Sequence, residues 1–377
     1  MLLLGLAVPI AYIPLVTGTA IHSTWLLLTL ALPFTLFRKI EMTPLHWLGL
    51  SALGWAAASL LWTENVYDSG EALWHLSILA LVFVLGASLP TLRPVFVGLC
   101  IGLGISIALV FAWQCGFRPV WQGTIDAPAG LFVTPNALGS ALALALVAAI
   151  IYQIYWFIPL AVYGLISTGF RTGLVSVGVV GLIALWQRNR PLALTLGVGL
   201  VTTIAAIFAI KNTGLASANQ RLEYWMATIP ALSWHGHGIG SFFQLYPTLS
   251  DWSPSRPEHA YNDFLELTFE LGLGVLPLWL MLALTLEAPR AERLILLCFL
   301  EQALCFFPLA LPVSAFMAAL VTGYLARCWA IHCSLWPDRG PTVSRRYSAW
   351  KFGGVAARGQ ALAVESSHSN EAGLRHA

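Results

Sequence analysis

Charged residues are scarce in this sequence, and their scarcity indicates its class. Asp, Glu, Lys and Arg make up 10% of the 377 residues, hydrophobic residues make up 58%, and the mean hydropathy is +0.77. An ordinary soluble domain carries about 25% charged residues. The long apolar runs that accompany this deficit predict an all-α integral membrane protein, because only helices and closed barrels span a bilayer. The alternative is a soluble enzyme with a very large core, and no nucleic-acid partner is expected.

Several motifs that would indicate other chemistry are also missing. No CxxC pair occurs, and five of the six cysteines lie in or beside apolar runs, where cysteine behaves as a small hydrophobic residue: Cys100, Cys298, Cys305, Cys328 and Cys333. There is no Walker motif, so a nucleoside triphosphate site is not expected. We therefore expect neither a metal nor a cofactor. No basic residue precedes the first apolar run, so residues 2–16 are predicted to be a retained membrane helix rather than a cleaved signal peptide.

Hydropathy predicts about twelve transmembrane helices. Several of these segments are shorter than the roughly 20 residues that a straight span needs. Their approximate ranges are 2–16, 21–37, 45–61, 73–90, 95–113, 137–153, 156–170, 172–187, 191–210, 263–286, 293–308 and 311–328.

Most basic residues fall on one side of this arrangement. They are Arg38, Lys39, Arg93, Arg188, Arg190, Arg290, Arg293, Arg327, Arg339, Arg345, Arg346 and Lys351. By the positive-inside rule this side is cytoplasmic, and both termini lie there. The acidic loop Glu64 to Glu71 and the segments 114–136 and 211–262 then lie outside. The chain is therefore predicted to be a multi-pass protein of a bacterial inner membrane, with one large periplasmic loop at about 211–262.

Two regions follow from this assignment. Residues 1–336 are predicted to form one polytopic membrane domain. The tail 337–377 is polar, with the run Ser366 to Glu371, and is predicted to be disordered and cytoplasmic. We expect no chemistry in the tail.

The few charges predicted to lie outside are clustered along the sequence. Arg171 lies at the outer end of a span, and Arg221 begins a segment with helical character for which Asn219 is the predicted N-cap. A glycine-rich turn follows at 235–243, and the run Glu258-His259-Ala260-Tyr261-Asn262-Asp263 leads into a span. Arginines at an outer membrane surface suit a phosphate or diphosphate, because guanidinium binds such oxyanions with two hydrogen bonds. A histidine beside them can act as a general base near neutral pH.

Each of these residues also has a simpler interpretation. Arg171 could be an interfacial anchor, and Arg221 could pair with Glu223. The fragment His235-Gly236-His237-Gly238 resembles part of a metal site, but a glycine-rich turn without acidic or cysteine partners is more often only a loop. His259 could interact with Asp263 one helical turn later. Asp263, Glu266 and Glu270 share a helical face near a helix N-terminus, which the helix dipole partly explains.

Glu301 is a separate case, because it lies within an apolar run beside Gln302. An ionisable residue inside a membrane segment indicates a partner or a functional role. The sequence does not identify that partner.

An ordered set of motifs resembles the superfamily of O-antigen ligases and O-antigen polymerases, which includes bacterial protein O-oligosaccharyltransferases. The matching segments are GIGSFF at 238–243, HAYNDFLEL at 259–267 and ELGLG at 270–274. Upstream, GLFVTPN at 130–136 is similar to the family's Gly-x-Phe-x-x-Pro-Asn signature, Arg171 begins a span, and Arg221 with Tyr224-Trp225 fits an Arg-x-x-x-Trp segment. These matches run in order from about 130 to 276, whereas the first third and the tail match only in hydropathy.

The resemblance implies a fold of about twelve helices with a large periplasmic loop. It also implies glycosyl transfer, without metal or ATP, from a polyprenyl-diphosphate-linked glycan to an acceptor hydroxyl. Carried over residue by residue, Arg171 and Arg221 would hold the donor diphosphate and His259 would be the base. The supporting positions would be Tyr261, Asn262, Asp263, Gly238 and Gly240.

One residue departs from the family pattern. Many members read His-x-His-Asn, and Tyr261 stands here in place of the second histidine. Either His259 is the base, displaced by two residues, or this subgroup uses different chemistry. A tyrosine with an ordinary pKa of about 10 is a poor base but a usable hydrogen-bond donor.

The first hypothesis is a ligase-like glycosyltransferase that delivers the glycan to lipid A-core. A polymerase would use a second lipid-linked glycan as acceptor, and an oligosaccharyltransferase would use a protein hydroxyl, which a loop of about 50 residues mildly disfavours. The second hypothesis is a transporter or flippase for an anionic lipid or solute, which would use the basic residues and Glu301. The residues do not decide among the sugars, the acceptors or the oligomeric states.

Overall fold

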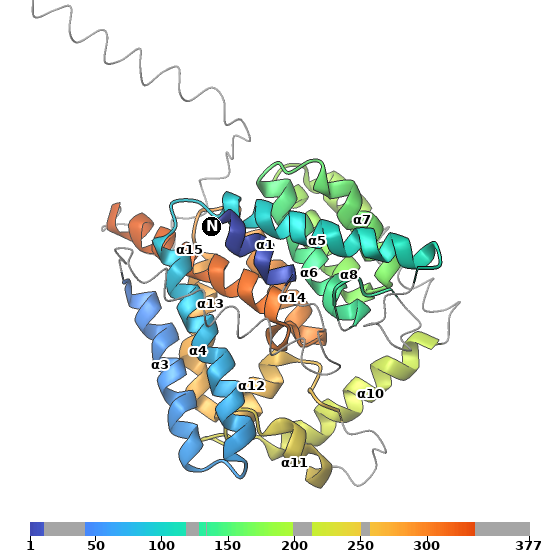
Figure 1. The fold of residues 1–377 in the computed structure, drawn as a ribbon. Helices are drawn as coiled ribbons and strands as arrows, with labels where there is room; N and C mark the ends of the chain where they lie inside the picture. Colours follow the sequence, from blue (N-terminus) through green and yellow to red (C-terminus); the bar gives the residue numbers. More distant parts are fainter. Residues whose placement is uncertain (11–41, 118–127, 133, 199–212, 250–256, 336–377) are drawn as a thin grey trace, which may run out of the picture. The chain divides into compact units, whose positions relative to one another are not determined.

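The computed structural model describes residues 1–10, 42–117, 128–132, 134–198, 213–249 and 257–335. Every secondary-structure element in these ranges is a helix, and Met1–Leu335 form one structural unit (Figure 1). The predicted span 21–37 and the predicted tail 337–377 lie outside the described residues. So do parts of the predicted spans 2–16 and 191–210.

The described helices divide into membrane-type helices and shorter loop helices. The former are α1 (Leu2–Ile10), α3 (Pro44–Ala58), α4 (Val66–Ser88), α5 (Arg93–Gln114), α6 (Pro135–Ile151), α7 (Phe157–Thr168), α8 (Arg171–Trp186), α13 (Leu276–Leu286), α14 (Arg293–Cys305) and α15 (Pro312–Leu335). The latter are α10 (Thr213–Thr228) and α11 (Phe242–Leu249), with short 3-10 helices η2 (Ser59–Leu61), η4 (Ile229–Ala231) and η6 (Pro308–Ala310). Helix α12 (Asp263–Leu271) continues through the 3-10 helix η5 (Gly272–Val275) into α13.

The predicted class of a helical membrane protein agrees with this architecture. Four helices in the described part are long and apolar enough to cross a membrane: Val66–Ser88, Arg93–Gln114, Asp263–Leu286 and Pro312–Ser334. Three shorter apolar helices accompany them, at Pro135–Ile151, Phe157–Thr168 and Arg171–Trp186. The count of about twelve spans remains a prediction.

Several helix boundaries differ from the predicted ones. Helix α4 begins at Val66 rather than at about residue 73, because the side chain of Asn65 accepts hydrogen bonds from the backbone N–H groups of Tyr67 and Asp68. This cap extends the helix through a polar first turn. Helix α15 continues to Leu335 rather than ending at about 328. Helix α10 begins at Thr213, so Asn219 lies inside that helix and the prediction of an N-cap at Asn219 was wrong.

Helix α6 lies at the centre of the packed helices. All residues from Ala137 to Ala149 are buried, and α6 contacts α5, α7, α8, α14 and α15. Its run of Ala and Leu suits this position, because small side chains allow neighbouring helices to approach closely.

Helices α4 and α15 also pack closely, through two glycines. A Cβ atom on Gly86 would overlap the carbonyl of Leu320, and one on Gly323 would overlap the carbonyl of Phe83. Backbones in such close contact gain dispersion energy over a long seam, which is a common way to join helices in lipid. The pair therefore forms a rigid support for the segments at both of its ends.

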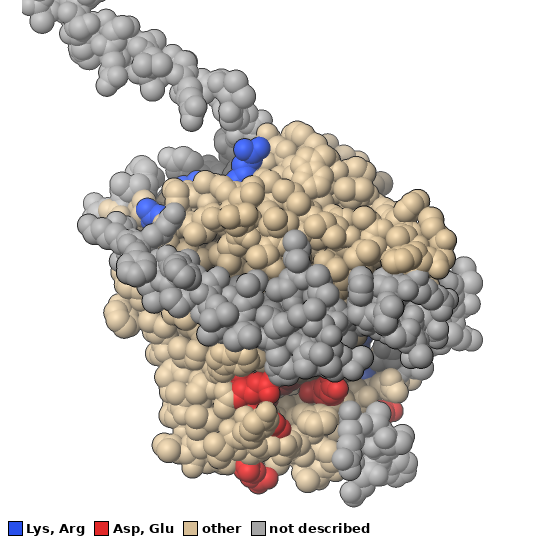
Figure 2. All heavy atoms as spheres, viewed as in Figure 1, with Lys and Arg blue, Asp and Glu red and all other residues tan. Residues whose placement is uncertain are grey.

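One end of the helices gathers basic residues. The Arg327 guanidinium lies 3.4 Å from the carbonyl oxygens of Ala87 and Leu89, and Arg93 Nε donates to the Tyr152 carbonyl at 3.4 Å. On the face that Figure 2 shows, most basic side chains lie at this end and the acidic side chains lie near the opposite one.

The opposite end joins the acidic loop to the glycine-rich turn. Gln244 donates to the Asp68 carboxylate at 2.6 Å, and the Ile239 N–H donates to the Ser59 hydroxyl at 3.0 Å. Two segments that the charge pattern assigns to the same side of the membrane therefore contact each other.

Candidate functional site

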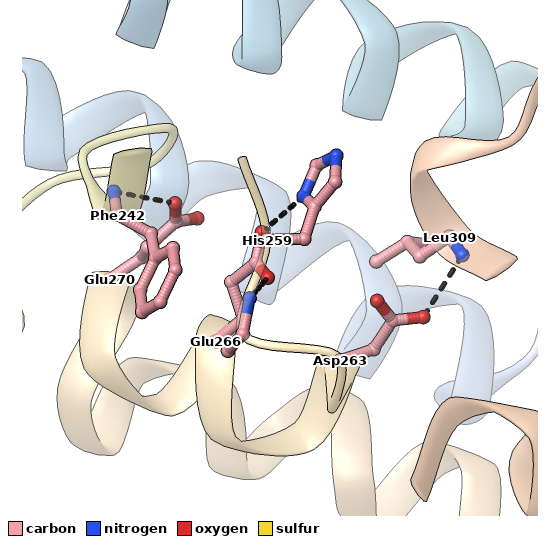
Figure 3. Close-up of polar contacts among 7 residues, drawn as sticks. Phe242, His259, Asp263, Glu266, Glu270 and Leu309 are labelled. Atoms are coloured by element: carbon pink, nitrogen blue, oxygen red, sulfur yellow. Dashed lines mark hydrogen bonds and ion pairs between the residues drawn. The ribbon is translucent and has the colours of Figure 1, made fainter. Parts of the chain in front are cut away.

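Helix α12 is the scaffold of the candidate site. Its Asp263, Glu266 and Glu270 lie on one face, and each carboxylate accepts hydrogen bonds from a different segment of the chain (Figure 3). Asp263 accepts from the backbone N–H of Leu309 at 2.9 Å. Glu270 accepts from the backbone N–H of Phe242 at 3.2 Å. The three acids therefore fasten loops to α12, a role well beyond the helix-dipole contribution predicted from sequence.

Glu266 holds the loop that carries His259. One carboxylate oxygen lies 2.8 Å from Nδ1 of His259, and the other accepts from the backbone N–H of Ala260 at 2.7 Å. The hydrogen-bond partner of His259 is therefore Glu266, and Asp263, the alternative partner considered from sequence, acts on His259 only through its charge. The His259 ring also stacks on Phe307, with ring centroids 4.5 Å apart and planes 23° apart.

The surroundings of His259 favour its charged form. Burial lowers the pKa of the imidazole, but the charge and hydrogen bond of Glu266, with smaller contributions from Asp263 and Glu258, outweigh burial and raise that pKa to about 9. His259 is thus largely protonated at neutral pH. Its side chain is 26% exposed, so it remains reachable from outside.

Arg221 reaches the same place from α10. Its Nη1 donates to the carbonyl of Cys305 at 2.8 Å, and its guanidinium lies 5.1 Å from the centre of the Tyr261 ring. The alternative pairing with Glu223 is not among the ion pairs of the described residues. Nε of Arg221 is buried without a hydrogen-bond partner in the described part of the chain. The guanidinium therefore keeps unused donors for a ligand.

Tyr261 occupies a constrained position between His259 and the start of α12. Its φ is +54°, in the left-handed region that bulky residues rarely adopt. Aromatic neighbours hold the ring: Tyr224 stacks at 6.2 Å and Phe307 meets it edge-on at 5.1 Å. Burial and Tyr224 raise the pKa of Tyr261, against the opposing effect of Arg221, which makes Tyr261 a hydrogen-bond donor rather than a base. Asn262 then caps α12 by accepting from the backbone N–H of Leu265 at 3.0 Å.

The glycine-rich turn is docked along the C-terminal half of α12. Gly238 and Gly240 have φ values of +102° and +72°, which any other residue would adopt only with strain. The Gly238 N–H donates to the carbonyl of Glu270 at 2.9 Å, and the His237 N–H donates to the carbonyl of Phe269 at 3.1 Å. The turn therefore supports α12 at a distance from His259.

The two histidines of this turn have local contacts. His237 stacks on Phe269 at 4.4 Å, and its Nε2 lies 2.8 Å from the Ala231 carbonyl oxygen. His235 lies 5.0 Å from the Trp234 ring centre. The described residues contain no cluster of three metal-ligating side chains.

Arg171 lies apart from this group in its recorded contacts. It is the exposed first residue of α8, and no contact in the described residues joins it to Arg221 or His259. Its neighbour Phe170 packs on Phe306, with ring centroids 4.8 Å apart. Arg171 therefore follows directly after a residue that packs on Phe306, and Phe306 belongs to a segment that the other site residues also contact.

That shared segment is Cys305–Phe307, which sequence reasoning did not include. Cys305 accepts from Arg221, Phe306 packs on Phe170, and Phe307 stacks on His259. The available signal was the Phe306-Phe307-Pro308 run, where α14 ends and a short connection to α15 begins. Arg221, Tyr261 and His259, three of the predicted site residues, meet at this connection.

No protein-family model matches the sequence, and no curated protein matches it. The function must therefore be argued from the residues and geometry of this chain.

An apolar cavity lies beside the Asp263 end of α12. It has a volume of about 130 Å³ and is lined by residues of α3, α4, α12, α13, α14 and α15, with Leu309 of η6. Asp263, Phe264 and Leu309 form part of its wall, and Leu309 is two residues from Phe307. Because Leu309 is close in sequence to Phe307, the cavity lies near the Cys305–Phe307 connection that Arg221 and His259 contact.

A second polar group lies within the membrane-type helices. Ser176 donates to the carboxylate of Glu301, which identifies the partner that the sequence could not name. Gln302, the next residue, accepts from Ser140 at 2.7 Å, and Ser140 lies 2.9 Å from the Ser314 hydroxyl. Both groups join α14 to neighbouring helices.

Proposed function

We propose that this protein is a membrane glycosyltransferase of the O-antigen ligase type. It would move a glycan from a polyprenyl-diphosphate carrier to an acceptor hydroxyl at the outer face of the membrane. The observation that carries the proposal is the meeting of Arg221, Tyr261 and His259 at the Cys305–Phe307 connection, beside an apolar cavity. A substrate with a charged diphosphate and a long apolar chain needs these two environments side by side.

Arg221 and Arg171 would hold the diphosphate. A guanidinium has five N–H donors, and Arg221 uses one of them on Cys305, so it can still bind an oxyanion with two hydrogen bonds. Arg171, one residue from the Phe170–Phe306 contact, would add a second positive charge. The apolar cavity would receive part of the carrier chain.

The reaction we propose is a direct inverting displacement. The acceptor oxygen forms a bond to the anomeric carbon of the glycan, and the bond from that carbon to the diphosphate oxygen breaks. The electron pair leaves with the diphosphate, whose charge the arginines stabilise. The hydroxyl proton passes to the unprotonated fraction of His259 at Nε2, because Nδ1 faces Glu266.

The finer assignments belong to the same proposal. The membrane domain 1–336 would have about twelve helices, with residues 211–262 in the periplasm, both termini in the cytoplasm, and the inner membrane as its location. Lipid A-core is the proposed acceptor, and a second glycan or a protein hydroxyl is the alternative. The clustering of basic contacts at one end of the helices supports this orientation.

The test is glycan transfer by membranes that contain single variants. Arg221→Ala and His259→Ala are each expected to reduce transfer by at least roughly a hundredfold, because a charged donor to a leaving group contributes about 3 kcal/mol or more and a general base contributes a rate factor of about a hundred or more. Arg190→Ala is the matched control: its guanidinium lies 5.8 Å from the Trp186 ring, far along the chain from the site. Near-normal transfer by the first two variants, at normal protein levels, would refute the proposal.

A transporter or flippase is the second candidate, and the polar contacts inside the helices favour it. Glu301 with Ser176 and Gln302 with Ser140 are polar pairs within otherwise apolar elements. Polar side chains inside transmembrane bundles can mark solute paths. Liposomes that contain the purified protein separate the two candidates: a transporter would move a labelled lipid-linked glycan across the bilayer without changing its glycosidic bond. A reporter-fusion map that places residues 211–262 in the cytoplasm would also refute the glycosyltransferase proposal.

A further inference from the structure

The His259 ring is held on two sides. Glu266 uses one carboxylate oxygen on His259 Nδ1 and the other on the Ala260 N–H, so it grips two consecutive residues at once. Phe307 covers a face of the ring at 4.5 Å. The ring cannot rotate about its Cβ–Cγ bond without breaking the Glu266 contact and losing the stacking. The orientation of the imidazole is therefore fixed before any substrate arrives.

This grip also decides which ring nitrogen is available. An ionised carboxylate only accepts hydrogen bonds, so Nδ1 of His259 must carry a proton and donate it to Glu266. Nε2 is then the atom that can exchange a proton. It has no hydrogen-bond partner within the described ranges, and Figure 3 shows it directed away from α12.

The charges around the ring come from identifiable elements. Helix α12 contributes Glu266 and Asp263, and the loop of His259 itself contributes Glu258. The Cys305–Phe307 connection contributes only the weakly acidic Cys305 thiol, and α10 contributes Arg221, whose guanidinium lies over the Tyr261 ring. Glu266 is the only one of these groups for which a hydrogen bond to His259 is recorded in the described residues.

We propose that Glu266 is a positioning residue for His259: its carboxylate orients the imidazole, keeps the proton on Nδ1 and presents Nε2 to the substrate. The proposal rests on the glycosyltransferase function proposed above. A carboxylate that orients a histidine and stabilises its charged form is a recurrent device in acyl-transfer enzymes, where it selects the tautomer without touching substrate. Here the same arrangement combines the loop residue His259 with a helix residue seven positions later.

The decisive experiment follows the titration of His259 by NMR in the full-length protein in nanodiscs. The chain has nine histidines, so the signal is assigned by its absence in His259→Gln. The wild-type signal is expected to titrate with a midpoint near pH 9. Glu266→Gln keeps an oxygen acceptor for Ala260 but removes the charge, and should lower the midpoint by at least about 1 pH unit. Glu266→Asp keeps the charge and should titrate at a pH between those of wild type and Glu266→Gln.

Glu71→Gln is the matched control, because Glu71 and His75 form a further histidine–carboxylate pair, at 3.9 Å on α4. This variant should leave the His259 midpoint unchanged. The proposal is overturned if Glu266→Gln titrates within about 0.3 pH units of wild type. A purely structural role would lower the yield of folded protein without moving the midpoint.

Transfer assays supply the catalytic readout. If His259 accepts a proton, wild-type transfer should rise with pH towards a midpoint near 9, and Glu266→Gln should show a lower midpoint and a maximal rate at least roughly tenfold lower. An unchanged rate and profile would contradict the positioning role. If wild-type protein transfers no glycan at all, the proposed function fails, and the NMR titration still decides whether Glu266 controls His259.

Discussion

Glu270 offers a direct test of how the glycine-rich turn is held. Its carboxylate is buried, at 5% exposure, and accepts from the Phe242 N–H at 3.2 Å. Glu270→Ala removes this acceptor and leaves a buried amide without a partner, which costs about 1–3 kcal/mol. The lost methylene adds about 0.8 kcal/mol. We therefore expect the docking of the turn to weaken by about 2–4 kcal/mol.

Hydrogen exchange measured by mass spectrometry reports this loss locally. If the turn opens in a fast equilibrium, 2–4 kcal/mol corresponds to about 30- to 900-fold faster exchange of the amides from Gly238 to Phe242. Glu270→Gln keeps an acceptor oxygen and should accelerate exchange far less. The exposed Glu223 on α10 provides the control, because Glu223→Ala removes a solvent-exposed carboxylate and should leave exchange in the turn unchanged. Unchanged exchange in Glu270→Ala would refute the argument that this carboxylate anchors the turn.

Three further predictions concern the residues around His259. Arg221→Lys should lower glycan transfer at least roughly tenfold in membrane assays, because one ammonium cannot reproduce the planar contacts with Cys305 and Tyr261; full activity would show that charge alone suffices. The pKa of His259 is raised from 6.5 to about 9, so the folded state binds the proton more tightly. This stabilisation should be complete below pH 6.5 and lost as the pH rises through 9. Melting temperatures of wild type and His259→Gln should therefore differ most below pH 6.5, and their difference should shrink as the pH rises towards 9. Asn262→Ala should cost about 1 kcal/mol through loss of the helix cap, and Asn262→Asp should cost much less; equal melting temperatures for the two variants would contradict this.

Composition and short-range patterns predicted part of this molecule. The scarcity of charge predicted helices in a membrane, and the sequence HAYNDFLEL placed His259, Tyr261 and Asn262 at one helix start. Of these features, the start of the helix after Asn262 depends on neighbouring residues, so a local pattern identified it, whereas the cap that Asn262 forms was not predicted. The ordered motifs also indicated Arg221, whose guanidinium does lie over Tyr261.

The rest depended on contacts between distant segments. Asp263 and Glu266 both lie within one or two helical turns of His259 along the sequence, and only the path of the loop, with Tyr261 at positive φ, decides that Glu266 is the partner. The bond between Arg221 and Cys305 joins residues 84 positions apart. A carbonyl acceptor has no side-chain signature, so no sequence pattern could identify it.

The Cys305–Phe307 connection has a practical consequence for anyone seeking a soluble form of the site. A fragment covering residues 211–262 would retain Arg221 and His259 but would lack the Cys305 carbonyl and the Phe307 ring that they contact. Such a fragment, even if it folded, would be a poor template for screening ligands of this site. Ligands should instead be sought on the whole chain in a lipid environment, where both halves of the site are present.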